Sequence, residues 1–219
     1  MKNVTSRTSN PFGMDPPCPE SGGDHDAVFG YGDANADIHV VGDNPSVHGG
    51  CDTGVPFTGT DAGERVLDVL ETVGLAERTG TDDGPSLSNC FLSYRYLCCR
   101  GDGDEDHPTA GDYDAFERFF DAELRAIGAH VLVPVGQRAT AHVLGTYTAR
   151  DPDQAVADRH GEVLHGSGFL VVSLSDPAEW TDGDAATAVD ALAELLASDY
   201  TQHADLGRFV PGGDPYFVR

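Results

Sequence analysis

The chain has 219 residues, enough to bury a full hydrophobic core, and its formal net charge is -24 at pH 7. No stretch approaches the apolar length of a membrane span, and the N-terminus lacks the hydrophobic region of a signal peptide. We therefore expect a cytoplasmic protein with no membrane contact. The acidic residues fall within apolar-periodic segments, which indicates a folded, solvated acidic surface rather than disorder.

The basic residues are few, and Lys2 is the single lysine. Acidic surfaces that are poor in lysine are typical of salt-loving organisms, so we expect a halophilic protein. At molar salt the Debye length is about 3 Å, which screens surface repulsion. The acidity therefore does not exclude a nucleic-acid partner.

The predicted elements alternate between strands and helices along the chain. They are a strand at 36–42, a helix at 61–75 that ends near Gly74, a strand at 88–97, a helix at 113–127 with Asp112 as N-cap, a strand at 130–136, a helix from 137 that ends at Gly145, a strand at 168–175 and a helix at 184–198. This order predicts an α/β fold of three layers, α/β/α, with a central four-stranded, mainly parallel sheet.

The regions outside these elements suggest the domain organisation. Residues 1–35 are rich in Gly, Pro, Asp and Ser and predict an irregular N-terminal arm, residues 36–200 form the α/β domain, and residues 201–219 are an irregular tail. Five cysteines (18, 51, 90, 98 and 99) are an odd set without a C-x-x-C pair. That pattern argues against a disulfide framework and against a zinc ribbon.

Polar turns follow the predicted strands at what should be one edge of the sheet. GDNPS follows the first strand, CCRGD the second and SDP the last, and ligands of open α/β sheets bind at this edge. The loop GVPFTG carries a lone aromatic, Phe57, close to the first turn. Together these segments suit a flat, polar ring as the ligand.

The ordered set GDNPS, GVPFTG, CCR, HPT, HVLVPVGQRATAHVLG and LSDPAEW resembles the uracil-DNA glycosylase superfamily over roughly residues 38–180. The likeness is nearest to its thermophile-type, family-four branch. It implies a monofunctional glycosylase of base excision repair, which flips a damaged base from DNA and hydrolyses its N-glycosidic bond. Two alternatives stay open: a non-catalytic nucleobase- or nucleic-acid-binding member of the same fold, and an unrelated α/β domain that binds another small ligand.

The resemblance assigns catalytic roles to the first turn. Asp43 stands where one branch has an acid that helps the attacking water, and Asn44 stands where other branches have an asparagine that positions it. Asp and Asn also favour turns without any function, so both residues could be turn caps alone.

The resemblance also assigns base-binding residues, which are Gly42, Pro45, Ser46, Phe57 and Arg95. Phe57 matches the aromatic that stacks on the flipped base, an interaction worth about 1–3 kcal/mol; the alternative is an ordinary core phenylalanine. Arg95 falls near the position of the asparagine that reads the uracil edge, and Asn89 would replace it only in another register.

The last motif departs from the family. Asp176 stands where the family has a histidine that supports the departing uracil anion, and a carboxylate there would repel an anion. His160 and His165 lie close by in sequence and are the candidates to replace that histidine, although isolated histidines are more often structural.

DNA contacts are expected from Trp180, as a wedge between base steps, and from Arg100; a tryptophan packed under its loop is the alternative. The family-four branch holds a four-iron cluster with four thiolates. Here Cys18 lacks its partner, Cys99 matches the third ligand and Phe116 occupies the fourth position. Because this set of thiolates is incomplete, we expect no cofactor and no metal. We also expect a monomer whose partner is DNA.

Overall fold

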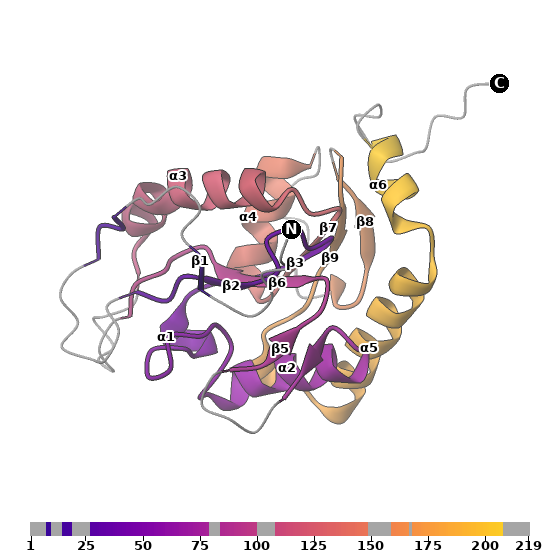
Figure 1. Cartoon of the computed structure of the whole chain (residues 1–219), viewed down its shortest axis with the longest axis horizontal. Coiled ribbons are helices and arrows are strands. Elements are labelled where there is room, and N and C mark those ends of the chain that lie inside the picture. The colour runs from indigo at the N-terminus through magenta and orange to yellow at the C-terminus, as the bar shows by residue number, and fades with distance from the viewer. Residues whose placement is uncertain are drawn as a thin grey trace.

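The computed structural model describes residues 8–9, 15–18, 27–78, 84–99, 108–148, 159–166 and 168–207. Within these ranges the chain forms a seven-stranded sheet in the order β1-β2-β6-β3-β7-β9-β8, with helices on both sides (Figure 1). The strands of this sheet are β1 (Thr8–Ser9), β2 (Gly30–Gly32), β3 (Ile38–Gly42), β6 (Cys90–Tyr94), β7 (Val131–Pro134), β8 (Val163–His165) and β9 (Leu170–Val172). The short strands β4 (Ala76–Glu77) and β5 (Ser86–Leu87) pair separately.

Four of these strands, β6, β3, β7 and β9, form the parallel centre that the alternating pattern predicts. The register places Gly42 opposite Tyr94, and Val41 opposite both Ser93 and Pro134. The three-layer α/β fold is therefore confirmed. The sheet is wider than the expected four strands, because β1, β2 and β8 add antiparallel edges.

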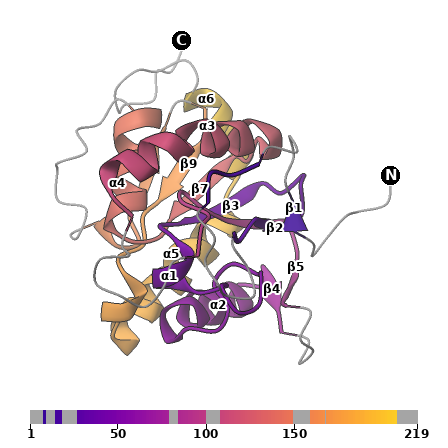
Figure 2. The same ribbon diagram turned by 90° about the vertical axis from the view of Figure 1, so that its left-hand side faces the viewer.

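Two helical layers cover the sheet (Figures 1 and 2). α3 (Ala110–Ile127) and α4 (Gln137–Tyr147) lie on one face, while α1 (Pro45–His48), α2 (Asp61–Thr72) and α5 (Asp182–Ala197) lie on the other. All five residues of β3 are buried, as expected for a central parallel strand. Val40 packs into the larger core cluster with α2, and Val41 into the smaller cluster with α4, because successive side chains point to opposite faces.

Several predicted helix boundaries shift because capping contacts decide them. α3 begins after Thr109, whose side chain forms a capping box with Asp112, so Asp112 is the third helical residue and not the N-cap. α4 continues past Gly145 and ends at Tyr147, with Thr148 as its C-cap. Residues Tyr200–Gly207 form helix α6, where an irregular tail was expected.

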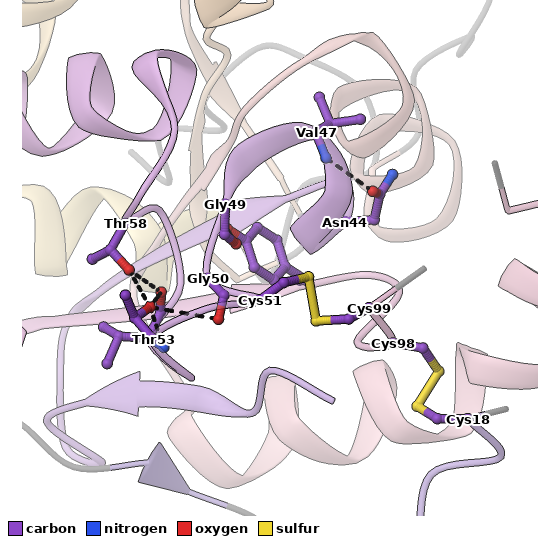
Figure 3. Close-up of a disulfide and its surroundings, with 12 residues drawn as sticks. Cys18, Asn44, Val47, Gly49, Gly50, Cys51, Thr53, Thr58, Cys98 and Cys99 are labelled. Carbon is purple, nitrogen blue, oxygen red and sulfur yellow. Dashed lines mark hydrogen bonds between the residues drawn. A yellow bond between two sulfur atoms is a disulfide. The ribbon is translucent and has the colours of Figure 1, made fainter. Parts of the chain in front are cut away.

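The cysteines correct another expectation, since four of the five pair in disulfides. Cys18 pairs with Cys98 and Cys51 with Cys99, while Cys90 is a buried free thiol. Figure 3 shows the two bridges side by side, with the adjacent Cys98 and Cys99 turned to different partners. The bridges tie the N-terminal arm and the loop after α1 to the segment that follows β6.

No helix in the described part of the chain is long and apolar enough to cross a membrane.

Candidate functional site

The turn after β3 is built around Asn44. This residue has extended backbone dihedrals and is the N-cap of α1, with its side-chain oxygen accepting a hydrogen bond from the Val47 amide at 3.2 Å. Pro45 occupies the first helical turn, where its missing N–H costs nothing. The turn-cap interpretation is therefore true of Asn44, and its side-chain NH₂ group stays available for a second contact.

That NH₂ group holds Asp43 and Tyr113 together. Asn44 Nδ2 donates to Asp43 Oδ2 at 3.3 Å and to the Tyr113 hydroxyl at 3.2 Å. Asp43 is 9% exposed, and its Oδ1 has no hydrogen-bond partner among the described residues. Burial raises the pKa of the Asp43 carboxyl, and its interactions with Tyr113, Arg138 and Arg95 oppose that shift. The turn thus holds a buried carboxylate whose Oδ1 is an acceptor without a partner among the described residues.

A charged group of side chains lies on the α3 and α4 side of this turn, which we call the ionic side: Arg95, Tyr113, Glu117 and Arg138. The guanidinium of Arg95 lies 5.0 Å above the centre of the Tyr113 ring, and that of Arg138 lies 5.6 Å from it. Arg95 also pairs with Glu117 at 3.8 Å. Burial and the neighbouring Asp43 charge raise the pKa of Tyr113 to about 12, so its hydroxyl stays protonated.

A neutral group lies on the other side of the turn, which we call the aromatic side: His48, Phe57 and Tyr94. The His48 and Phe57 rings are stacked at 5.7 Å, and the Phe57 and Tyr94 rings are 5.2 Å apart. The Tyr94 hydroxyl accepts from the Phe57 amide at 2.7 Å and donates to the Gly49 carbonyl at 2.9 Å. Burial lowers the pKa of His48 to about 4, while Asp176 acts in the opposite direction.

The structure places Phe57 differently from the expected stacking surface. Its ring has no exposed surface and belongs to the main core cluster, covered by His48 and Tyr94. In this arrangement the core interpretation of Phe57 holds, since a base cannot contact a ring that has no exposed surface. A positive φ of 64° at Phe57 shows that the loop backbone is turned sharply to bury the ring.

Gly42, Pro45 and Ser46, which the sequence also predicts as base-binding residues, lie in or beside the turn after β3. Gly42 is required because a Cβ there would lie 2.5 Å from the Tyr94 ring and 2.8 Å from Phe57. Ser46 is exposed on α1, and Pro45 is buried. The Asp43 amide, in the same turn, donates to His48 Nδ1 at 3.2 Å.

Arg95 lies beside the turn, since its amide donates to the Gly42 carbonyl at 3.1 Å. Its side chain points to the ionic side and not toward Phe57. Asn89, the alternative in another register, precedes β6 and bonds to Asp37 and Tyr200 at the opposite end of the strand. That alternative is therefore wrong.

Asp176 follows β9 and caps the short 3-10 helix η3 (Pro177–Glu179), where its carboxylate accepts from the Ala178 amide at 3.0 Å. The negative charge of Asp176 acts on His48 and raises its pKa, against the larger effect of burial. His160 does not replace the family's histidine, because its two ring nitrogens are bonded to Ser175 and to the Asp184 carbonyl. His165 is exposed on the edge strand β8.

Trp180 is the clearest correction among the DNA contacts. Its side chain is 7% exposed, and its indole N–H donates to Ser175 while the ring meets His160 edge-on at 5.3 Å. A buried, bonded indole cannot act as a wedge in this arrangement, so the alternative, a tryptophan packed under its loop, is correct. Arg100 lies outside the described residues.

The donor set for an iron cluster does not fit. Cys18 and Cys99 belong to different disulfides, and Phe116, at the position of the fourth ligand, is buried in the aromatic core. Described residues form no group of three or more histidines, cysteines or acids that could hold a metal ion. No step of the proposed chemistry is therefore assigned to a cluster.

The parallel sheet with a polar turn at the carboxyl end of its central strand defines an α/β protein of the class whose ligands bind at that edge. The family model of the uracil DNA glycosylase superfamily matches residues 29–195, which is most of the chain. The chain therefore belongs to the uracil-DNA glycosylase superfamily, as the sequence motifs indicated.

Two relatives are similar over long stretches. A type-5 uracil-DNA glycosylase of Pyrobaculum aerophilum is 29% identical over 172 residues, which cover 76% of this chain and 72% of the relative. A type-5 uracil-DNA glycosylase of Thermus thermophilus is 30% identical over 135 residues, covering 61% of this chain and 60% of the relative. Both relatives carry the type-5 name, whereas the motifs alone pointed nearest to the family-four branch.

Sequence reasoning missed two residues of the site, His48 and Tyr113. His48 ends the short helix that Asn44 caps, so its place four residues after Asn44 was a signal that could have found it. Tyr113 is 69 residues from Asn44 in the chain, and no local pattern indicates their contact.

Proposed function

We propose that this protein is a monofunctional uracil-DNA glycosylase, which flips a damaged base from DNA and hydrolyses its N-glycosidic bond. The observation that carries the proposal is the buried Asp43 carboxylate at the carboxyl edge of the sheet. Asn44 and Tyr113 hold it, and its Oδ1 has no partner in the part of the chain that the structure describes. Both similar proteins are named uracil-DNA glycosylases, which supports uracil as the base.

The chemistry follows from the charge that such a reaction develops. Breaking the bond between the sugar and the base leaves positive charge on the sugar and negative charge on the base. A carboxylate that is fixed and partly desolvated stabilises the sugar cation without reorganising, and its free oxygen can orient the water that attacks. Asp43 takes both roles, and Asn44 and Tyr113 fix its position.

DNA contact in such an acidic chain is expected to depend on a few arginines. Arg138 is exposed at the start of α4, directly beside the turn, and Arg95 is half-buried next to it. Guanidinium groups suit phosphate recognition. We expect the protein to act as a monomer in a salt-rich cytoplasm, where screening removes the repulsion between its surface and DNA.

A uracil-containing oligonucleotide in molar potassium chloride tests the proposal. We expect wild-type protein to leave abasic sites, measured as strand breaks after alkaline treatment, and the Asp43→Ala, Asn44→Ala double variant to leave none. The same oligonucleotide with thymine in place of uracil is the substrate control. Equal release from uracil and thymine strands, or no release above the double variant, contradicts the proposal.

A second function, binding without catalysis, is favoured by Asp176. A carboxylate whose charge reaches the site is unfavourable for a departing anion, which suits a protein that holds a nucleobase or nucleic acid without breaking the bond. Fluorescence anisotropy of a labelled uracil strand separates the two functions. Saturable binding with no abasic product supports the binding protein, and product formation supports the glycosylase.

A further inference from the structure

One arginine of α2, Arg65, holds the loop between β9 and α5 from the outside. Its Nη1 atom donates to the Pro177 carbonyl at 2.8 Å and to the Trp180 carbonyl at 3.1 Å. The same atom donates to the Ala178 carbonyl at the longer distance of 3.4 Å. These carbonyls lie at the end of η3, where the peptide oxygens of a helix have few partners within the helix. Arg65 is therefore a side-chain cap that joins the loop to α2.

The loop is also fastened on its inner side. The Trp180 indole donates to the Ser175 carbonyl at 3.1 Å, and its ring lies edge-on against His160. Because Arg65 binds the carbonyl of the same tryptophan, α2 holds the backbone at this position while the interior holds the side chain. A change at Arg65 therefore acts on the outer fastening and leaves the inner contacts in place.

The loop lies at the same edge of the sheet as the turn after β3. β9 runs parallel to β7, and a bridge between Val135 and Leu174 continues this pairing up to the loop. The negative charge of Asp176, the N-cap of η3, acts on His48 at the end of α1. The loop therefore borders the candidate site, and its shape contributes to the surface that the site presents to DNA.

We propose that Arg65 is a positioning residue, which keeps the loop of residues 175–181 in the shape that receives the DNA strand. This inference rests on the proposed glycosylase function. A loop that is ordered before binding loses little conformational freedom when DNA binds, so the complex forms at a lower concentration. Arg65 makes no hydrogen bond to the described residues of the Asp43–Asn44 turn. Its effect is therefore expected in the binding of DNA and not in the rate of cleavage at saturation.

The exposure of Arg65 separates an effect on the loop from an effect on stability. When the guanidinium is removed, water can bind the carbonyls at this surface in its place, so the free energy of unfolding changes little. The outer part of the loop then has fewer contacts and samples more conformations.

The first experiment uses Trp180 as a reporter, because it is the single tryptophan of the chain. Acrylamide quenching of its fluorescence is measured in the whole protein and in the Arg65→Met and Arg65→Lys variants. We expect the methionine variant to raise the quenching constant at least about twofold. The lysine variant should lie between it and wild type, because the ammonium keeps a donor for the carbonyls. The matched control, Arg78→Met, removes an arginine that pairs with acidic residues of α2 and should leave quenching unchanged.

The second experiment separates binding from cleavage. Single-turnover release of uracil from a duplex is measured over a range of protein concentrations. Arg65→Met should raise the half-saturating concentration about tenfold and change the rate at saturation by less than about twofold. Arg65→Lys should recover part of the loss, and Arg78→Met should match wild type. The urea midpoints of all these variants should stay close to that of wild type.

The salt dependence of binding distinguishes positioning from direct contact between Arg65 and a phosphate. Loss of one phosphate contact reduces the slope of log affinity against log salt concentration by about one. Loss of loop order releases no counterions, so we expect Arg65→Met to keep the wild-type slope. A slope reduced by about one in this variant overturns the inference in favour of a phosphate contact.

Two other results overturn the inference. One is unchanged quenching in both Arg65 variants, and the other is a loss that falls on the rate at saturation while the half-saturating concentration stays the same. In both cases wild-type protein still releases uracil and the proposed function stands. Wild-type protein that releases no uracil overturns the proposed function, and the positioning role with it.

Discussion

The aromatic side and the ionic side of the Asp43–Asn44 turn differ in what they can do for a reaction. His48, Phe57 and Tyr94 are buried and neutral, so they form a low-dielectric surface in which His48 Nε2 has no hydrogen-bond partner among the described residues. The ionic side is partly solvated and combines arginines, Tyr113 and Glu117 in mutual contact. A hydrogen-bond donor on a buried surface acts strongly on charge that develops during the reaction. Charged groups near water are screened and mainly orient their neighbours. We therefore expect chemistry to depend on one side and positioning on the other.

The turn itself should show the largest effect. The Asp43→Asn variant should lower the rate of uracil release by about 10²–10⁴-fold, because the amide cannot take a proton from water. Its stability should not fall, since burial disfavours the ionised carboxyl that the change removes. Single-turnover kinetics and urea unfolding measure the two effects. Asp190→Asn on the exposed surface of α5 is the control, and a similar rate for both variants would contradict the role of Asp43.

On the aromatic side, the Phe57→Ala variant should lower the free energy of unfolding by about 3–5 kcal/mol, because it empties a fully buried site in the core. Chemical denaturation in molar potassium chloride measures the loss. Val163→Ala on the exposed edge of β8 is the control and should change stability by less than about 0.5 kcal/mol. If Phe57→Ala costs no more than this control, the ring is not part of the core and could be free to stack on a base.

The next largest effect should be the pH dependence of the free energy of unfolding, to which His48 contributes from the aromatic side. Unfolded His48 takes up a proton near pH 6.5, and folded His48 does so only at about pH 4, so the unfolded state binds more protons between these values. The free energy of unfolding should therefore fall as pH drops from 6.5 to 4, by up to about 3 kcal/mol from this residue. The difference between wild type and His48→Gln isolates it, because other buried histidines are common to both. Parallel curves would show that His48 does not carry the effect.

The smallest effect should come from the ionic side. Tyr113→Phe removes the hydroxyl that accepts from Asn44 at 3.2 Å, and we expect losses of about 1 kcal/mol in stability and about tenfold in uracil release. Tyr147→Phe is the matched control, since its hydroxyl donates to Glu117 at 3.5 Å and makes no hydrogen bond to the described residues of the turn. Equal effects of the two changes would mean that Tyr113 does not position Asp43.

The amino-acid sequence by itself determined the parallel centre of the sheet, the order of its strands and helices, and the place of the Asp43–Asn44 turn. These features depend on apolar periodicity, turn residues and capping, which act between residues close in the chain. The family likewise followed from motifs in order, and the match over residues 29–195 confirmed it.

Only the tertiary structure decided which side chains meet across the site. The Cys18–Cys98 bridge joins residues 80 apart in the sequence, and the Asn44–Tyr113 contact joins residues 69 apart. Burial of Trp180 and of Phe57 was equally undetermined, because an aromatic in a loop fits a surface or a core. Packing of distant segments settles these choices, since the free energy of burial depends on neighbours that no local pattern specifies.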